Sequence, residues 1–177
     1  MKTPYHTLDI GNTGNIDLED YGTVIITFVE LSKIDADLPT VMDWVENGGK
    51  LLFAIRPDNS AALLRIAPHL GIEYLEDGYI QPVGVEFLSE LLPGTAGVQF
   101  GLDFLNHSSL PVSLKDSSKL HIISADGNGE PILWETSFGK GKIVFINSDQ
   151  FIDKSSRGLI GAAYSLLQDV IICFNDY

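Results

Sequence analysis

The chain has 177 residues, of which 45% are hydrophobic and 20% charged, as expected for one ordinary globular domain. Its formal net charge of −13 argues against nucleic acid and anionic membranes as partners, because phosphate-rich surfaces attract basic proteins. The single cysteine excludes an intrachain disulfide, and no apolar run approaches the roughly 18 residues of a membrane-spanning helix.

The first predicted elements are strands. Residues 5–10 are expected to form a short strand, and residues 11–15 a turn rich in glycine and asparagine. Residues 22–29 (GTVIITFV) are a nearly continuous run of β-branched and apolar residues. Such a run is typical of a parallel strand that is buried on both faces.

A helix is predicted after this strand. One apolar stripe recurs at helical spacing, at Leu38, Val41, Met42 and Val45. Asp37 is the expected N-cap, with Pro39 in the first turn. The residues Asn47-Gly48-Gly49 should end the helix, since glycine tolerates the left-handed conformation of a C-terminal cap.

A second buried strand is predicted at residues 50–55 (KLLFAI). Strand, helix and strand then form a βαβ unit, whose crossover is almost always right-handed. Residues 60–70 are predicted to form a further helix, and residues 72–75 a short strand. Residues 79–115 are rich in proline and glycine, and we expect an irregular insertion of short strands and loops there.

Three strands separated by glycine-rich turns are predicted next, at residues 119–124, 131–137 and 142–147. Their short connections indicate an antiparallel meander. The last element is a helix over residues 157–172, which carries a wide apolar face.

Three stretches of the sequence, taken in their order along the chain, carry a resemblance to a known family of domains. They are residues 20–26 with 44–52 (DYGTVII and WVENGGKLL), the hairpin at 139–144 (GKGKIV), and the loop at 147–150 (NSDQ) before Arg157-Gly158. This order resembles class I glutamine amidotransferase-like domains of the non-catalytic type, which are attached to bacterial glycosidases and polysaccharide-deacetylase-like proteins. The resemblance covers most of the chain outside residues 79–115.

The resemblance implies a fold class and a domain organisation. It implies an α/β fold, in which a mostly parallel sheet lies in a three-layer, flavodoxin- or Rossmann-like arrangement with an antiparallel meander near the C-terminus. Residues 1–177 would form a single amidotransferase-like domain. Such domains usually open with a strand and a helix before the segment that matches residues 5–10. We therefore expect the chain to lack that first strand and helix, with a naturally short variant as the alternative.

An active amidotransferase of this class needs a cysteine on a tight strand-to-helix turn, activated by a histidine that a carboxylate orients. Residues 56–60 (RPDNS) follow the strand at 50–55 and contain no cysteine. Cys173 falls in the predicted final helix, where a buried cysteine behaves as a small hydrophobic residue. Ser60 is better explained as a helix cap than as a nucleophile. The sequence predicts no catalytic residue.

Metal and cofactor sites are also not predicted. No two of the four histidines, His6, His69, His107 and His121, are spaced as ligands on one helix. His121 falls in a strand and is interpreted as a structural histidine. Residues 126–130 (DGNGE) lack the register of a calcium loop and are interpreted as a hairpin turn.

The segment 147–157 is the candidate ligand site, because it follows a buried strand and precedes a helix. In open α/β sheets, ligands bind beyond the carboxyl ends of strands, and helix N-termini attract anions. The candidate binding residues are Asn147, Asp149, Gln150 and Arg157. The alternative is that Asp149 and Arg157 form an ion pair that only shapes the loop.

Taken with the resemblance, these patterns predict a catalytically inactive accessory or interaction domain of a larger, carbohydrate-active bacterial protein. Its partners would be other domains of that parent protein or a second copy of the chain. Two rivals stay open: a hydrolase that uses carboxylates such as Asp149, and a small-molecule binding domain that uses the loop after Asn147. The first residues show no apolar signal-peptide core, although a parent protein can be exported, so the compartment stays open.

Overall fold

A computed structural model of the chain describes part of its residues. These are residues 17–26, 31–54, 65–68, 70, 74–75, 85–87, 99–100, 113–114, 120–125, 127–129 and 131–147. The strand predicted at residues 5–10 and the helix predicted at 157–172 lie outside these ranges. Of the helix predicted at 60–70, residues 65–68 and 70 are described, and they are helical.

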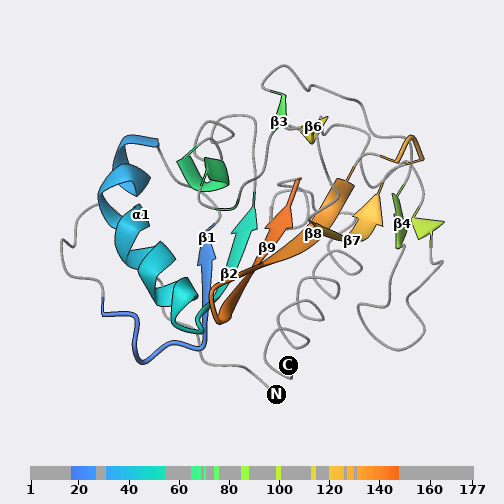
Figure 1. Ribbon diagram of the computed structural model, residues 1–177. Coiled ribbons are helices and arrows are strands. Elements are labelled where there is room, and N and C mark those ends of the chain that lie inside the picture. The colour runs from blue at the N-terminus through green and yellow to red at the C-terminus, as the bar shows by residue number, and fades with distance from the viewer. Residues whose placement is uncertain are drawn as a thin grey trace, which may run out of the picture.

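A seven-stranded sheet forms the centre of the described structure, in the order β1-β2-β9-β8-β7-β4-β5. Figure 1 shows this order from β1 at the left to β4 at the right. The strand bounds are β1 Thr23–Ile26, β2 Lys50–Ala54, β9 Gly141–Ile146, β8 Pro131–Phe138, β7 His121–Ala125, β4 Val85–Phe87 and β5 Gln99–Phe100. A separate pair joins β3 (Tyr74–Leu75) to β6 (Ser113–Leu114).

The sheet is mixed, so the prediction of a mostly parallel sheet is wrong for the described residues. The pairs β1–β2 and β2–β9 are parallel. All the other pairings, from β9 across to β5, are antiparallel. The predicted meander of β7, β8 and β9 is confirmed. The difference arises because β4 and β5, from the stretch 79–115, add antiparallel strands beyond the meander.

The crossover helix α1 (Leu31–Glu46) begins earlier than its sequence predicted. Asp37 is therefore an interior, buried residue and not the N-cap, and Pro39 lies inside the helix. Pro39 is exposed, so its ring lies on the solvent side of the helix, and because proline has no N–H it leaves one intrahelical hydrogen bond unmade.

The predicted end of α1 is confirmed. Gly48 has a φ of 124°, in the region that favours glycine. Gly48 N donates to Val45 O at 2.9 Å, and Gly49 N donates to Trp44 O at 3.0 Å. This pair of bonds is a Schellman motif, which satisfies carbonyls that the end of a helix leaves open.

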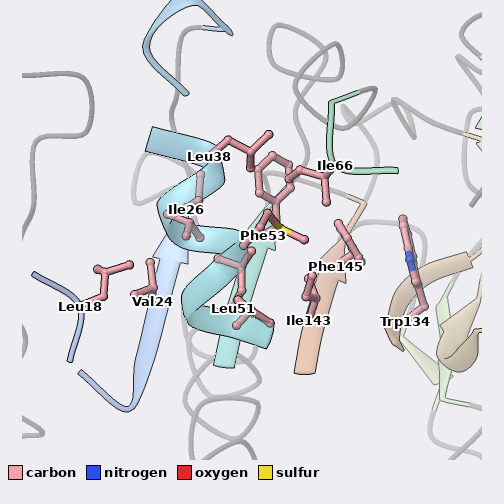
Figure 2. Packing of buried hydrophobic residues seen from close by; sticks show 13 residues of the cluster. Leu18, Val24, Ile26, Leu38, Leu51, Phe53, Ile66, Trp134, Ile143 and Phe145 are labelled. Atoms are coloured by element: carbon pink, nitrogen blue, oxygen red, sulfur yellow. The ribbon is translucent and has the colours of Figure 1, made fainter. Parts of the chain in front are cut away.

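Helix α1 and one face of the sheet enclose the main apolar core, which Figure 2 shows. Alternate residues of β1, β2 and β9 point into it, namely Val24, Ile26, Leu51, Phe53, Ile143 and Phe145. Trp134 of β8 extends the core, with its ring stacked on Phe145 at a centroid distance of 5.4 Å. Ile66 of the helical turn at 65–68 completes this layer.

The opposite face of the sheet is buried in its centre but not at β1. Leu52, Leu133, Val144 and Ile146 are each at most 2% exposed. Strand β2 is therefore buried on both faces, as predicted. Ile25 of β1 is 40% exposed, so the same prediction is wrong for β1, which lies at the end of the described sheet.

The turn between β8 and β9 packs directly on the end of α1. Lys140 N donates to Glu46 O at 2.8 Å, and Lys142 N donates to Gly49 O at 3.3 Å. A Cβ on Gly141 would collide with the backbone carbonyls of Val45 and Gly49. Because no side chain fits there, the helix end, the start of β2 and the start of β9 are held in close contact.

Candidate functional site

The parallel strands bring their carboxyl ends to one edge of the sheet. Ile26 of β1 pairs with Phe53 of β2, and Ala54 of β2 pairs with Ile146 of β9. The chain leaves β9 at Asn147, so the predicted ligand loop starts at this edge. The direction of the parallel strands therefore places the start of this loop at their carboxyl ends, which is where the predicted ligand site has to lie.

Asn147 is the candidate site residue that the structure describes, and it is 1% exposed. Its backbone N donates to Ile132 O at 2.7 Å, which extends the pairing of β8 and β9 by one residue. Its side-chain Nδ2 donates to Pro131 O at 3.3 Å. The amide thus anchors the first residue of β8 to the end of β9, across a sequence separation of 16 residues.

Two further buried polar groups lie near this edge, and sequence patterns did not indicate either. Ser124 and Trp134 are each 1% exposed. Within the described part of the chain, Ser124 Oγ and Trp134 Nε1 have no hydrogen-bond partner. Ser124 pairs with Leu133, whereas Trp134 pairs with Phe145, so the two groups lie on opposite faces of the sheet. Buried polar atoms normally have a partner, which makes this edge unusual.

The other candidate binding residues, Asp149, Gln150 and Arg157, lie outside the described residues. The expected pairing of Asp149 with Arg157 therefore stays a prediction. The nucleophile candidates that the sequence argued against, Ser60 and Cys173, also lie outside the described ranges.

A charged cluster occupies the other end of the meander. His121 Nδ1 lies 3.0 Å from Glu135 Oε1, and Lys142 Nζ lies 3.1 Å from Glu135 Oε2. The side chain of His121 is 57% exposed and that of Lys142 is 37% exposed. His121 therefore has a partner, as predicted, but it is a surface residue. Exposed pairs of this kind contribute little to stability.

Metal ligands do not gather in the part of the chain that the structure describes. There, no group of three or more His, Cys, Asp or Glu side chains is arranged to hold an ion. Among the same residues, no helix has both the length and the apolar character needed to cross a lipid bilayer.

Comparison with known proteins identifies the family. The model of a family described as "uncharacterised protein conserved in bacteria" (DUF2194) matches residues 1–93. This match covers more than half of the 177 residues. The chain belongs to the DUF2194 family. No curated protein matches the DUF2194 chain in sequence.

Solved structures similar to this DUF2194 chain include three of different kinds. A cytoplasmic protein of Salmonella typhimurium LT2 is 15% identical, with a TM-score of 0.60 over 86% of this chain and 71% of that chain. A glutamine amidotransferase from Thermotoga maritima is 12% identical, with a TM-score of 0.55 over 90% of this chain and 80% of that chain. The exo-β-1,4-mannosidase Op5Man5 from Opitutaceae bacterium strain TAV5 is 18% identical, with a TM-score of 0.50.

The match to the mannosidase covers very different shares of the two chains. The match covers 92% of the DUF2194 chain but 26% of the mannosidase chain, so this chain spans about a quarter of that protein. At these identities the likeness shows a shared α/β fold and not a shared activity.

Proposed function

We propose that the chain is a catalytically inactive, amidotransferase-like domain that serves as an accessory or interaction module. The observation that carries the proposal is the sequence after β2. This strand lies between β1 and β9 in the parallel part of the sheet, and residues 55–60 follow it without a cysteine. A nucleophile on the strand-to-helix turn is what amidotransferase chemistry of this class requires.

We further propose that the module works inside a larger carbohydrate-active protein of bacteria. The support is the likeness to about a quarter of an exo-β-1,4-mannosidase chain, together with the sequence resemblance to glycosidase-attached domains. A three-layer arrangement belongs to the same proposal. Its support is the burial of Leu52, Val144 and Ile146 on the sheet face opposite α1, because a sheet face this apolar needs a covering layer.

The accessory role is tested by comparing the parent protein with and without residues 1–177. Deletion should lower the thermal stability or change the assembly of the remaining domains, while their active site keeps its chemistry. A parent protein that keeps its stability and its assembly without this module would contradict the accessory role. A glycosidase or glutaminase activity that resides in the isolated residues 1–177 would contradict the inactive role separately.

A small-molecule site at the carboxyl end of β9 is the second candidate function. The observation that favours it is the burial of Asn147 and Ser124 close to the point where β9 ends. In this proposal Asn147 holds the end of β9 in place, and Asp149, Gln150 and Arg157 contact the ligand. Arg157→Ala should then abolish ligand binding at little cost in stability, whereas Asn147→Ala should weaken both. Equal loss of stability in the two variants would instead favour a structural role for Arg157.

A further inference from the structure

A histidine, a glutamate and a lysine meet on three adjacent strands, away from the candidate ligand site. His121 of β7 and Glu135 of β8 are directly opposite each other in the strand register, and Lys142 lies on the next strand, β9. His121 Nδ1 lies 3.0 Å from Glu135 Oε1, and Lys142 Nζ donates to the same oxygen at 3.2 Å. One carboxylate oxygen therefore contacts both nitrogens.

The contacts of Glu135 decide which ring nitrogen of His121 carries a proton. A lysine ammonium has donors only, and the carboxylate that pairs with it has acceptors only. Because Glu135 can only accept, His121 Nδ1 has to donate to it. A neutral imidazole has one N–H, so the lone pair of the neutral ring lies on Nε2.

Nε2 belongs to the most exposed side chain of the three. His121 is 57% exposed, against 37% for Lys142 and 21% for Glu135. Among the described residues, the ring of His121 bonds to Glu135 alone. An accessible ring nitrogen with a fixed lone pair can act as a nucleophile, which needs only the approach of a small electrophile. Metal binding would need further ligands, and within the described ranges no set of three gathers.

We propose that His121 is a phosphoryl acceptor, with Glu135 and Lys142 as its positioning residues. In the reaction with a phosphoramidate, Nε2 attacks phosphorus and forms a new N–P bond. The ammonium group of the donor leaves as ammonia and takes the electron pair of the broken P–N bond. The proton on Nδ1 stays in its bond to Glu135, which stabilises the positive charge of the substituted ring. The Lys142 ammonium attracts the anionic donor to this end of the meander.

The modification changes the charge of an exposed surface. A phosphoryl group carries about −1.5 to −2 charges near neutral pH. On His121 it attracts Lys142 and repels Glu135, which weakens the attraction between those two side chains. The surface formed by the starts of β7 and β9 then presents a different charge pattern to a partner.

The test is incubation of the whole chain with potassium phosphoramidate at mildly alkaline pH, followed by peptide mapping and phosphorus NMR. The phosphoryl group should be found on Nε2 of His121. Glu135→Gln should slow the reaction at His121 about tenfold and give a mixture of Nδ1 and Nε2 products, because it removes the charge-assisted bond that fixes the proton. Ser137→Ala, at an exposed position of β8, is the control and should keep both the rate and the product.

Unfolding the chain in urea supplies the second comparison. Both ring nitrogens are then accessible, so both products should form at His121. The proposal is overturned by an unmodified His121 in the folded protein or by a product on Nδ1. It is also overturned if Glu135→Gln keeps the wild-type rate and a pure Nε2 product. A merely structural role of Glu135 would not change the ratio of the two products.

Discussion

The two ends of β9 are held by different means. At its start, Gly141 lies so close to the carbonyls of Val45 and Gly49 that no side chain fits. At its other end, the amide of Asn147 is buried and bonds to Pro131 O. Close packing fixes the first end, whereas polar contacts fix the second. Buried polar residues cost stability, and proteins tolerate them where they organise a functional site. We therefore expect a ligand site at the second end, where β9 leaves the sheet.

The largest expected effect comes from Gly141→Ala at the packed end. The added methyl group meets backbone atoms, which cannot turn aside as a flexible side chain would. We expect the free energy of unfolding, measured by urea denaturation, to fall by about 3 kcal/mol.

Gly129→Ala is the matched control for that variant. Open space surrounds Gly129, so the substitution adds only the strain of a positive φ, about 1–2 kcal/mol. If Gly141→Ala costs no more than Gly129→Ala, the close packing of this end is not what stabilises it.

Asn147→Ala at the polar end should have the next largest effect. It removes the bond from Nδ2 and leaves Pro131 O buried without that donor. The free energy of unfolding should fall by about 1–3 kcal/mol. Ser137→Ala, at an exposed position of β8, is the control and should stay within about 0.5 kcal/mol of the wild type. Equal stability of the two variants would contradict the anchoring role of Asn147.

Ser124→Ala is expected to act in the opposite direction. Its hydroxyl is buried and has no hydrogen-bond partner within the described residues, so the folded state bears the cost of removing it from water. Chemical denaturation should show a variant that is as stable as the wild type or up to about 1 kcal/mol more stable. A clear loss of stability would mean that bound water or a ligand at this edge satisfies Oγ, and would strengthen the second candidate function.

The smallest effect is predicted for Glu135→Gln in the surface cluster. The pairs with His121 and Lys142 are largely open to solvent, so their loss should change the free energy of unfolding by less than about 1 kcal/mol. Added salt should shrink the difference further, because it screens exposed charges. A loss that exceeds the effect of Asn147→Ala would show that this cluster, and not the polar end of β9, organises the meander.

The meander was predictable because its signals are local. Short apolar runs and the turn Gly139-Lys140-Gly141 define β8 and β9 almost to the residue. The start of α1 was missed because Asp37 and Pro39 form a pattern typical of a helix N-terminus. The antiparallel strands β4 and β5 were not predictable in place, since their pairing depends on contacts with distant β7.

The position of Asn147 in the fold was predictable, but its contacts were not, and the ligand site around it stays a prediction. The polar run after a buried strand placed Asn147 at the carboxyl edge of the sheet, where β9 ends. The bond from Asn147 to Pro131 depends on the register of β8 against β9, which no local pattern encodes. The buried hydroxyl of Ser124 depends likewise on an irregular register between β7 and β8.

The central proposal is that this chain, which is similar in fold to a glutamine amidotransferase, lacks the chemistry of an amidotransferase. The most direct measurement is ammonia release from glutamine by the purified chain, with the Cys173→Ala variant assayed in parallel. We predict no release above the buffer background from either protein, because residues 55–60, which follow β2 directly, contain no cysteine. Release by the wild type that disappears in Cys173→Ala would contradict it.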